Sequence, residues 1–244
     1  MTALRIALLG AESTGKSTLA QALHETLPAL TGLRVARVDE YLREWCDREG
    51  RTPRADEQLG ILEEQERRAD ALAAGHDVLI ADTTALMPAL YSEYLFADTR
   101  LAAPAHRAHR RYHLSLLMAT DLPWVADGMR DGPHAQAPVD RLLRRWLREA
   151  GHAFVVVQGQ GPQRLEHALN AITPLLKDRV AALPAQPPWP SSAGEPAPGG
   201  LFSRLLDRQA RLPGSTRWTC ELCDDPACEH ALKSATPSTT PPVP

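Results

Sequence analysis

Residues 10–18 read GAESTGKST, in which two glycines frame a short loop and a lysine precedes two hydroxyl residues. The stretch satisfies the spacing GxxxxGK[ST], and it lies between an apolar run at 5–9 and a helical pattern that starts at Lys16. Gly10 and Gly15 permit backbone conformations that other residues avoid, so successive amides can point at phosphate oxygens where a helix begins. A coincidental glycine turn is the alternative, but it does not account for the flanking strand and helix. We therefore predict a phosphate-binding loop (P-loop).

Short apolar runs alternate with longer helical patterns from the start of the chain to residue 178. Parallel strands need crossover connections, so strands separated by helices predict a parallel sheet with helices on both faces. The predicted fold class is α/β, a P-loop NTPase with a doubly wound, five-stranded parallel sheet. The expected strands are 5–9, 34–38, 77–81, 112–118 and 153–157, and the expected helices are 16–26, 40–48, 54–74, those within 84–109, 137–150 and 162–176.

The residue types of the P-loop suit a nucleoside triphosphate and its magnesium ion. Lys16 is a mobile cation for the β- and γ-phosphates, and the Ser17 hydroxyl can join the Mg²⁺ shell. Signalling GTPases read guanine with an Asn-Lys pair after a later strand, and residues 119–121 read ATD instead. ATP with Mg²⁺ is therefore the expected cofactor. Its predicted binding residues are Gly10, Ser13, Thr14, Gly15, Lys16, Ser17, Thr18 and Arg164. Arg164 would lie beside the adenine, although a plain turn explains the glycines before it equally well.

Composition and charge are those of an ordinary globular protein. The chain has 244 residues, of which 43% are hydrophobic and 23% charged, and this balance excludes a collagen-like or wholly disordered polymer. A net charge of -3 provides no general cationic field, so we expect neither a nucleic acid nor a membrane as partner. No apolar run approaches the roughly 18 residues of a membrane helix, and no cleavage site follows the first strand. We expect a cytoplasmic protein.

The composition changes after residue 178, where Pro, Gly, Ala and Ser begin to dominate. Such a segment has too little apolar surface to fold alone, and it acts as a semi-rigid spacer. The sequence therefore predicts a P-loop domain at 1–178, a linker at 179–200, a short helix with a cysteine-rich tail at 201–232, and a disordered terminus at 233–244.

The cysteine-rich tail carries four soft metal ligands at short spacing within residues 218–230, WTCELCDDPACEH. A CxxC pair with two further ligands can complete a tetrahedral Zn²⁺ site, whereas secreted disulfide frameworks spread their bridges across the fold. The flanking acidic residues disfavour a redox thiolate. An unliganded tail stays open, because the final Cys-x-His gap is shorter than common finger spacings. The candidate zinc ligands are Cys220, Cys223, Cys228 and His230.

Acidic residues follow the second and third predicted strands. Ligands of open parallel sheets bind beyond the carboxyl ends of the strands, so we expect these side chains near the γ-phosphate. Asp82 is a candidate Mg²⁺ ligand, and a helix N-cap is its alternative role. Glu40 could accept a proton from an acceptor hydroxyl or anchor that hydroxyl; a favourable helix-dipole contact is its alternative, and Asp39 competes for the same role.

A loop after the fourth predicted strand gathers aromatic, acidic and basic residues, and residues 121–131 read DLPWVADGMRD. An ordinary capped loop can have the same composition. Phosphoryl transfer also needs cations beyond the P-loop lysine, and Arg130 and Arg141 are our preferred candidates. Arg141 begins a cationic stripe on a predicted helix, for which a solvated face is the alternative. The other members of that stripe are Arg144, Arg145 and Arg148.

Four segments together resemble the kinase domain of NadR-type ribosylnicotinamide (nicotinamide riboside) kinases. They are GAESTGKST, DEYLREW, IADTT and LLMATDLPWVADGMRD, in this order, and PWVADGMRD is the most distinctive of their parts. The resemblance covers roughly residues 4–176. It implies ATP-dependent phosphorylation of the 5'-hydroxyl of nicotinamide riboside, which gives nicotinamide mononucleotide in NAD salvage.

The resemblance also implies roles for individual residues. The indole face of Trp124 suits a cationic pyridinium ring, and Asp127 offers charge complementarity. A buried Trp124 and a local ion pair between Asp127 and Arg130 are the alternatives. The predicted substrate-binding residues are Glu40, Tyr41, Arg43, Trp124, Asp127 and Arg130. The predicted catalytic residues are Lys16, Glu40, Asp82 and Arg130, with Ser17 and Asp82 as magnesium ligands.

Other functions stay open from the sequence. Larger members of the family carry a DNA-binding segment and an adenylyltransferase domain, and because this sequence begins at the P-loop strand we expect neither activity. Another nucleoside could be the acceptor, since an indole stacks on many bases. A protein of a different class, an ATPase switch or adaptor, would use the zinc tail to bind a protein partner. The sequence does not specify an oligomeric state.

Overall fold

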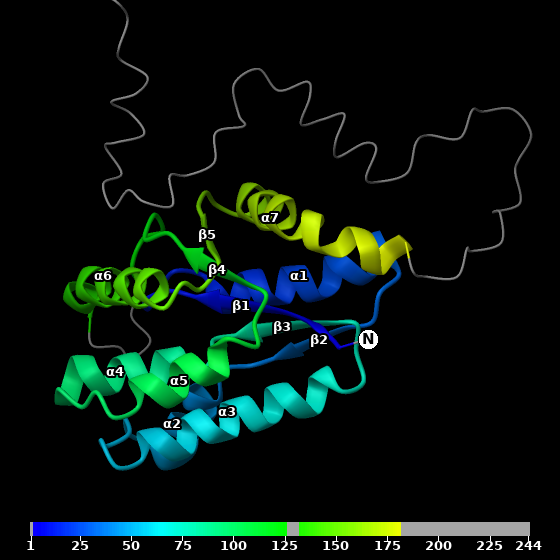
Figure 1. Cartoon of the computed structure of the whole chain (residues 1–244). Coiled ribbons are helices and arrows are strands. Elements are labelled where there is room, and N and C mark those ends of the chain that lie inside the picture. Colours follow the sequence, from blue (N-terminus) through cyan, green and yellow to red (C-terminus); the bar gives the residue numbers. More distant parts are fainter. Residues whose placement is uncertain (1, 126–131, 182–244) are drawn as a thin grey trace, which may run out of the picture. The chain divides into compact units, whose positions relative to one another are not determined.

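The computed structural model describes residues 2–125 and 132–181 (Figure 1). The chain divides into two units, 1–189 and 190–244, and every described residue belongs to the first unit. Most of the predicted linker, the cysteine-rich tail and the predicted disordered terminus therefore lie outside the described residues. Within the two described ranges, no helix has the length and apolar character of a membrane span.

A five-stranded parallel sheet forms the centre of the described unit, with the strand order β2-β3-β1-β4-β5. The central strand is β1 (Leu4–Leu9), and its Leu8 lies opposite Asp82 of β3 and Leu116 of β4. This arrangement confirms the predicted α/β fold class. The other strands are β2 (Val35–Val38), β3 (Val78–Asp82), β4 (Leu114–Met118) and β5 (Phe154–Val157).

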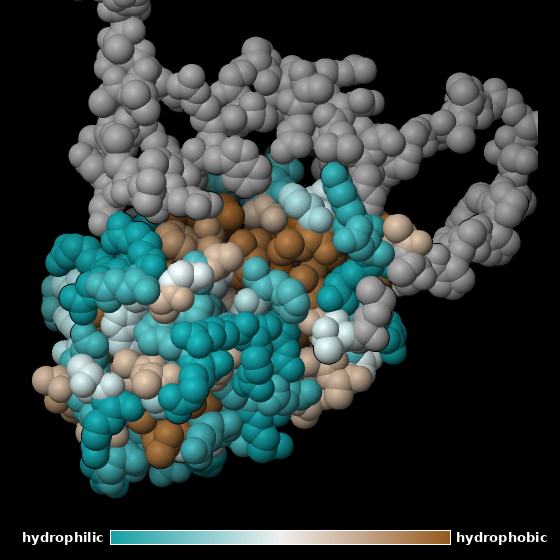
Figure 2. All heavy atoms as spheres, in the orientation of Figure 1, coloured by the Kyte–Doolittle hydropathy of each residue, from teal (hydrophilic) through white to brown (hydrophobic). Residues whose placement is uncertain are grey.

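Helices cover both faces of the sheet (Figure 1). One face carries α1 (Lys16–Thr31) and α7 (Pro162–Ala181). Figure 2 shows mostly hydrophilic side chains over the outward surface of the opposite layer, as expected for helices that bury one side. The helices of that layer are α2 (Tyr41–Glu49), α3 (Gln58–Ala73), α4 (Leu86–Phe96), α5 (Ala102–His109) and α6 (Pro133–Glu149).

The side chains of β1 are buried on both faces of the sheet. Ala7 and Leu9 belong to an apolar cluster with residues of α4 and α6, and Ile6 and Leu8 point to the opposite face because strand side chains alternate. Burial on both sides explains why this strand is an almost uninterrupted apolar run in the sequence. The buried β1 places the P-loop that follows it at the carboxyl edge of the sheet.

Among the helices that differ from their predicted bounds, two have an end that glycine or proline sets. α1 continues to Thr31 and ends at Gly32, whose left-handed φ of 73° suits the residue that terminates a helix. α6 begins at Pro133, earlier than predicted, since proline fits the first turn of a helix, where its missing N–H costs nothing.

A buried histidine connects the end of β3 with β4. His109 Nδ1 lies 3.0 Å from Thr84 Oγ1, and His109 Nε2 lies 2.9 Å from Ser115 Oγ. All three side chains are almost fully buried. Each hydroxyl can donate or accept, so a neutral imidazole is satisfied at both nitrogens. Burial, together with the neighbouring His152 and His106, lowers the pKa of His109 to about 3.

The free energy of unfolding should decrease as the pH falls from about 6.5 toward 3. The pKa of His109 is lower in the folded protein than in the unfolded chain, so the neutral imidazole imposes no cost on folding above about pH 6.5. Below that pH, the free energy of unfolding decreases by up to about 1.4 kcal/mol per pH unit. Urea denaturation at pH 8, 6 and 5 would measure this slope. The variant His109→Gln should flatten it, and an unchanged slope in that variant would contradict the assignment.

Candidate active site

The two glycines of the P-loop lie where any side chain would collide. Gly10 has a φ of 155°, and a Cβ there would lie 2.9 Å from Met118 Cβ. Gly15 has a φ of 78°, and its Cβ would lie 2.9 Å from Leu122 Cδ1. The glycine spacing of the motif thus reflects both the backbone conformation and the close approach of the residues after β4.

The P-loop presents a positive helix end to the solvent. Gly15 is the N-cap of α1 and provides no side-chain hydrogen bond, and the first turn contains no acidic residue. The first amides of α1 are therefore available to an anion. Lys16 Nζ donates to the carbonyl oxygens of Gly10, at 3.0 Å, and of Ala11, at 3.1 Å. When a phosphate binds, the ammonium group would leave these carbonyls and bind the phosphate oxygens instead.

Asp82 lies at the carboxyl end of β3, beside the start of α1. Its carboxylate accepts a hydrogen bond from the Ser17 side chain. Burial raises the pKa of Asp82, whereas the Ser17 hydrogen bond and the Lys16 charge lower it. The N-cap of α4 is Ala85, so Asp82 does not cap that helix. A hydroxyl and a carboxylate are hard oxygen donors of the kind that Mg²⁺ takes, and the assignment of this pair as magnesium ligands stays a prediction.

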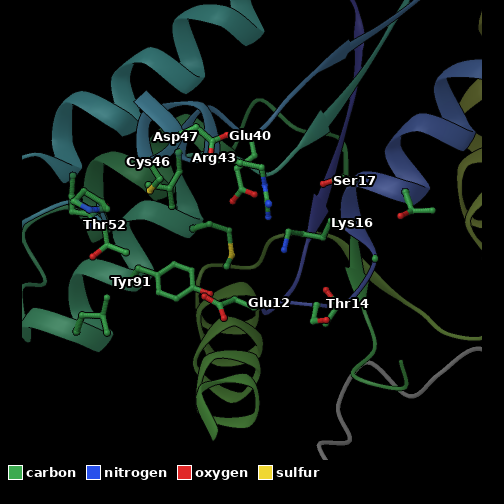
Figure 3. A pocket seen from close by; sticks show the side chains of 18 residues that line it. Glu12, Thr14, Lys16, Ser17, Glu40, Arg43, Cys46, Asp47, Thr52 and Tyr91 are labelled. Atoms are coloured by element: carbon green, nitrogen blue, oxygen red, sulfur yellow. The ribbon is translucent and has the colours of Figure 1, made fainter. Parts of the chain in front are cut away.

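A pocket of about 270 Å³ opens beside the P-loop, between α2 and α4 (Figure 3). Lys16, Glu40 and Arg43 point into the same space, and the Tyr91 ring points toward Glu12. An acceptor bound here would therefore face the position of the γ-phosphate. The lining residues are Glu12 to Thr18, Glu40, Leu42, Arg43, Cys46, Asp47, Thr52, Pro53, Gln58, Met87, Tyr91 and Leu95.

The two acidic residues after β2 occupy different surroundings. Glu40 lines the pocket and is the N-cap of α2, although its side chain makes no capping hydrogen bond. Asp39 is 69% exposed and pairs with Arg37 at 2.8 Å. The buried Gln65 amide holds the backbone on both sides of Glu40. Its oxygen accepts from Tyr41 N at 2.8 Å, and its nitrogen donates to Asp39 O at 3.2 Å. Of the two competing carboxylates, the structure thus places Glu40 at the pocket.

Three residues predicted to contact ligands do not line the pocket. Tyr41 does not line the pocket, and its ring lies 4.4 Å below the Arg68 guanidinium. Arg164 is almost fully buried; its guanidinium donates to the Thr14 and Gly159 carbonyls and to Asp121. It therefore supports the P-loop from behind. Trp124 is half-buried and does not line the pocket.

Residues after β4 nevertheless contact the P-loop. Val125 N donates to Ser13 Oγ at 2.8 Å, so the segment that carries Trp124 lies against the phosphate site. Asp127 and Arg130 lie outside the described residues, as do all four candidate zinc ligands. Within 2–125 and 132–181, no group of three or more His, Cys, Asp or Glu side chains could hold a metal ion.

The cationic stripe of α6 is largely a paired surface. Arg144 forms an ion pair with Asp140 at 2.7 Å, and Arg145 forms one with Glu93 at 2.9 Å. Arg141 is exposed. The first turn of α6 does approach the P-loop, because Gln136 Nε2 donates to Glu12 O at 3.0 Å.

The sequence predictions missed one wall of the pocket. Met87, Tyr91 and Leu95 of α4 line it, and their spacing of four residues places them on one face of the helix. That spacing was the available signal, but an apolar stripe is more often part of the core. Cys46 of α2 also lines the pocket, and burial raises the pKa of its thiol.

A parallel sheet whose central strand leads through a glycine-bounded, lysine-bearing loop into a helix defines a P-loop NTPase. This chain belongs to a family of AAA domains, whose model matches residues 5–164. No curated protein matches the chain.

Solved structures of P-loop kinases share this fold. A NadR protein crystallised in complex with NR has a TM-score of 0.57 and 19% identity, covering 71% of this chain and 51% of the NadR chain. A NadR protein in complex with NAD and AMP-PNP has the same TM-score and identity, covering 71% and 49%. Thymidylate kinase from Ehrlichia chaffeensis has a TM-score of 0.53 and 13% identity, covering 72% and 100%. The chain spans about half the length of the NadR chains it resembles.

Proposed function

We propose that this protein is an ATP-dependent nucleoside kinase whose acceptor is nicotinamide riboside. The observation that carries the proposal is the pocket that joins the P-loop to Glu40 and to the apolar wall of α4. A γ-phosphate on the P-loop and an acceptor hydroxyl at Glu40 would then face each other. The motif resemblance and the NadR fold likeness support the choice of acceptor.

Each residue of the site has a separate task in the proposed reaction. Lys16 and the first amides of α1 bind the phosphates and stabilise the charge that develops during transfer. Glu40 accepts the proton of the acceptor hydroxyl, whose oxygen attacks the γ-phosphorus while the bond to the β-phosphate oxygen breaks. ADP is the leaving group.

Ser17 and Asp82 would hold the magnesium ion, which neutralises charge on the β- and γ-phosphates when it is bound. The fit rests on the hydrogen bond between these two side chains and on the buried Asp82 Oδ1, which has no hydrogen-bond partner among the described residues. A cation would satisfy this oxygen.

The charges around the pocket favour a nucleoside over a nucleoside monophosphate. Among the described residues, three carboxylates, Glu12, Glu40 and Asp47, line the space, and the lining cations are Lys16 and Arg43. An acceptor phosphate would need several cations to offset its desolvation. A cationic pyridinium ring is compatible with the acidic lining, and the Tyr91 ring could stack on it.

A panel of acceptors tests the proposal directly. The protein with Mg·ATP should phosphorylate nicotinamide riboside with a kcat/KM at least about tenfold higher than that for uridine or thymidine monophosphate. The reason is that the attraction between a cationic ring and a buried carboxylate contributes about 1.4 kcal/mol or more. Phosphorus NMR would identify the 5'-phosphate product. Preference for the monophosphate, or ATP hydrolysis indifferent to every acceptor, would refute the proposal.

A further inference from the structure

The residue after Asp82 has a strained backbone. Thr83 has a φ of 80°, in the left-handed region that a β-branched side chain rarely adopts. Such strain costs folding free energy, and it persists only where the surrounding structure determines the conformation. Strained residues of this kind gather at functional sites, so the position merits a physical explanation.

Several hydrogen bonds hold the strained segment in place. Thr83 N donates to Leu8 O at 3.1 Å, which extends the pairing of β3 with β1. Ala85 N donates to the buried Glu66 carboxylate at 2.9 Å, and Thr84 Oγ1 bonds to His109. Hydrogen bonds on both sides of Thr83 therefore fix its conformation, without a hydrogen bond from its own hydroxyl to any described residue.

Two neighbouring oxygens of this segment are buried without partners. Thr83 Oγ1 and Asp82 Oδ1 have no hydrogen-bond partner in the described part of the chain, and the two residues are 1% and 3% exposed. Burying an unsatisfied polar atom is unfavourable, and native structures avoid it unless a ligand or water completes the bond. The two oxygens belong to consecutive residues, and one of them belongs to the carboxylate that bonds Ser17.

We propose that Thr83 is a positioning residue of the magnesium site, whose hydroxyl and Asp82 Oδ1 together hold one water of the Mg²⁺ shell. Magnesium in nucleotide sites keeps several of its waters and is bound by few protein ligands, so outer-shell acceptors are needed to orient them. Asp82 lies beside Ser17 and Lys16 at the start of α1, and Thr83 follows it directly in the chain. The inference rests on the proposed nucleotide site, but it is independent of the identity of the acceptor.

The variant Thr83→Val tests the inference because valine keeps the shape and removes the hydroxyl. Without nucleotide, we expect a melting temperature equal to or above that of the wild type, since an unsatisfied buried oxygen is lost. Calorimetry should show Mg·ATP binding about tenfold weaker than in the wild type, while ATP in EDTA binds both proteins equally. Thr83→Ser, which keeps the hydroxyl, should bind Mg·ATP about as tightly as the wild type.

Ser92→Ala is the matched control. Ser92 is fully buried in α4, and its hydroxyl likewise has no hydrogen-bond partner among residues 2–125 and 132–181, but it is not adjacent to Asp82 in the chain. Removing it should leave magnesium-dependent ATP binding unchanged.

The inference would be overturned in several ways. A lower melting temperature of Thr83→Val with unchanged Mg·ATP affinity would make the hydroxyl structural, and equal loss of binding with and without magnesium would separate it from the ion. If the wild type itself does not bind Mg·ATP, the proposed function fails as well. Magnesium-dependent binding by the wild type that Thr83→Val retains would overturn only this inference.

Discussion

Replacing Lys16 with alanine is expected to lower ATP-dependent phosphoryl transfer by about a thousandfold in kcat/KM. The ammonium group is the one P-loop side chain that can follow charge onto the transferred phosphate, and losing a preorganised contact of this kind costs about 10² to 10³ in rate. Among the described residues, Lys16 hydrogen-bonds only to backbone carbonyls of its own loop, so its removal should leave the core intact. Coupled ADP release with nicotinamide riboside as acceptor would measure the loss.

Lys177→Ala provides the control for this experiment, because Lys177 is exposed on α7 and lines no part of the pocket. Its activity should equal that of the wild type. Both variants should show the circular dichroism and cooperative melting of the native protein. Retained turnover in Lys16→Ala would remove the P-loop as the site of transfer.

Glu40→Gln is expected to lower kcat by about 10² to 10⁴ with little change in Mg·ATP affinity. The substitution preserves size and hydrogen bonding but removes the base that accepts the hydroxyl proton. Glu40 lines the pocket at the N-cap of α2, on the acceptor side of Lys16. Single-turnover kinetics would separate the chemical step from nucleotide binding.

The neighbouring Asp39→Asn is the matched comparison. Asp39 is exposed and pairs with Arg37, and an exposed ion pair contributes at most about 1 kcal/mol. Its kcat should therefore stay within about twofold of the wild type. A larger loss in Asp39→Asn than in Glu40→Gln would reverse the assignment of the base.

Local signals were sufficient for the phosphate half of the site. The spacing of Gly10, Gly15 and Lys16 requires a strand, a tight loop and a helix in succession, and all three are contiguous in the chain. Asp82 could be predicted because the carboxyl end of a strand in a parallel sheet lies at the ligand edge. Both inferences depend on the direction of the backbone, which an apolar run followed by a helical pattern already determines.

The acceptor half depended on packing that no local pattern encodes. Tyr41 lies next to Glu40 in sequence, yet helical geometry turns successive side chains away from each other, and Tyr41 packs under Arg68 while Glu40 lines the pocket. Arg164 follows the last strand as predicted, but its burial behind the P-loop arises from contacts with Thr14 and Asp121, which are far away in sequence.

The amino-acid sequence by itself determined the sheet, the P-loop, its lysine and the carboxylate after β3, because each depends on the identity and spacing of neighbouring residues. Only the tertiary structure decided which side chains of α2 and α4 enclose the pocket, and that Thr83 is held in a strained conformation between β1 and the Glu66 carboxylate. The physical reason is that helix packing and buried hydrogen bonds join residues remote in the chain, whose approach depends on the volume and polarity of every side chain between them.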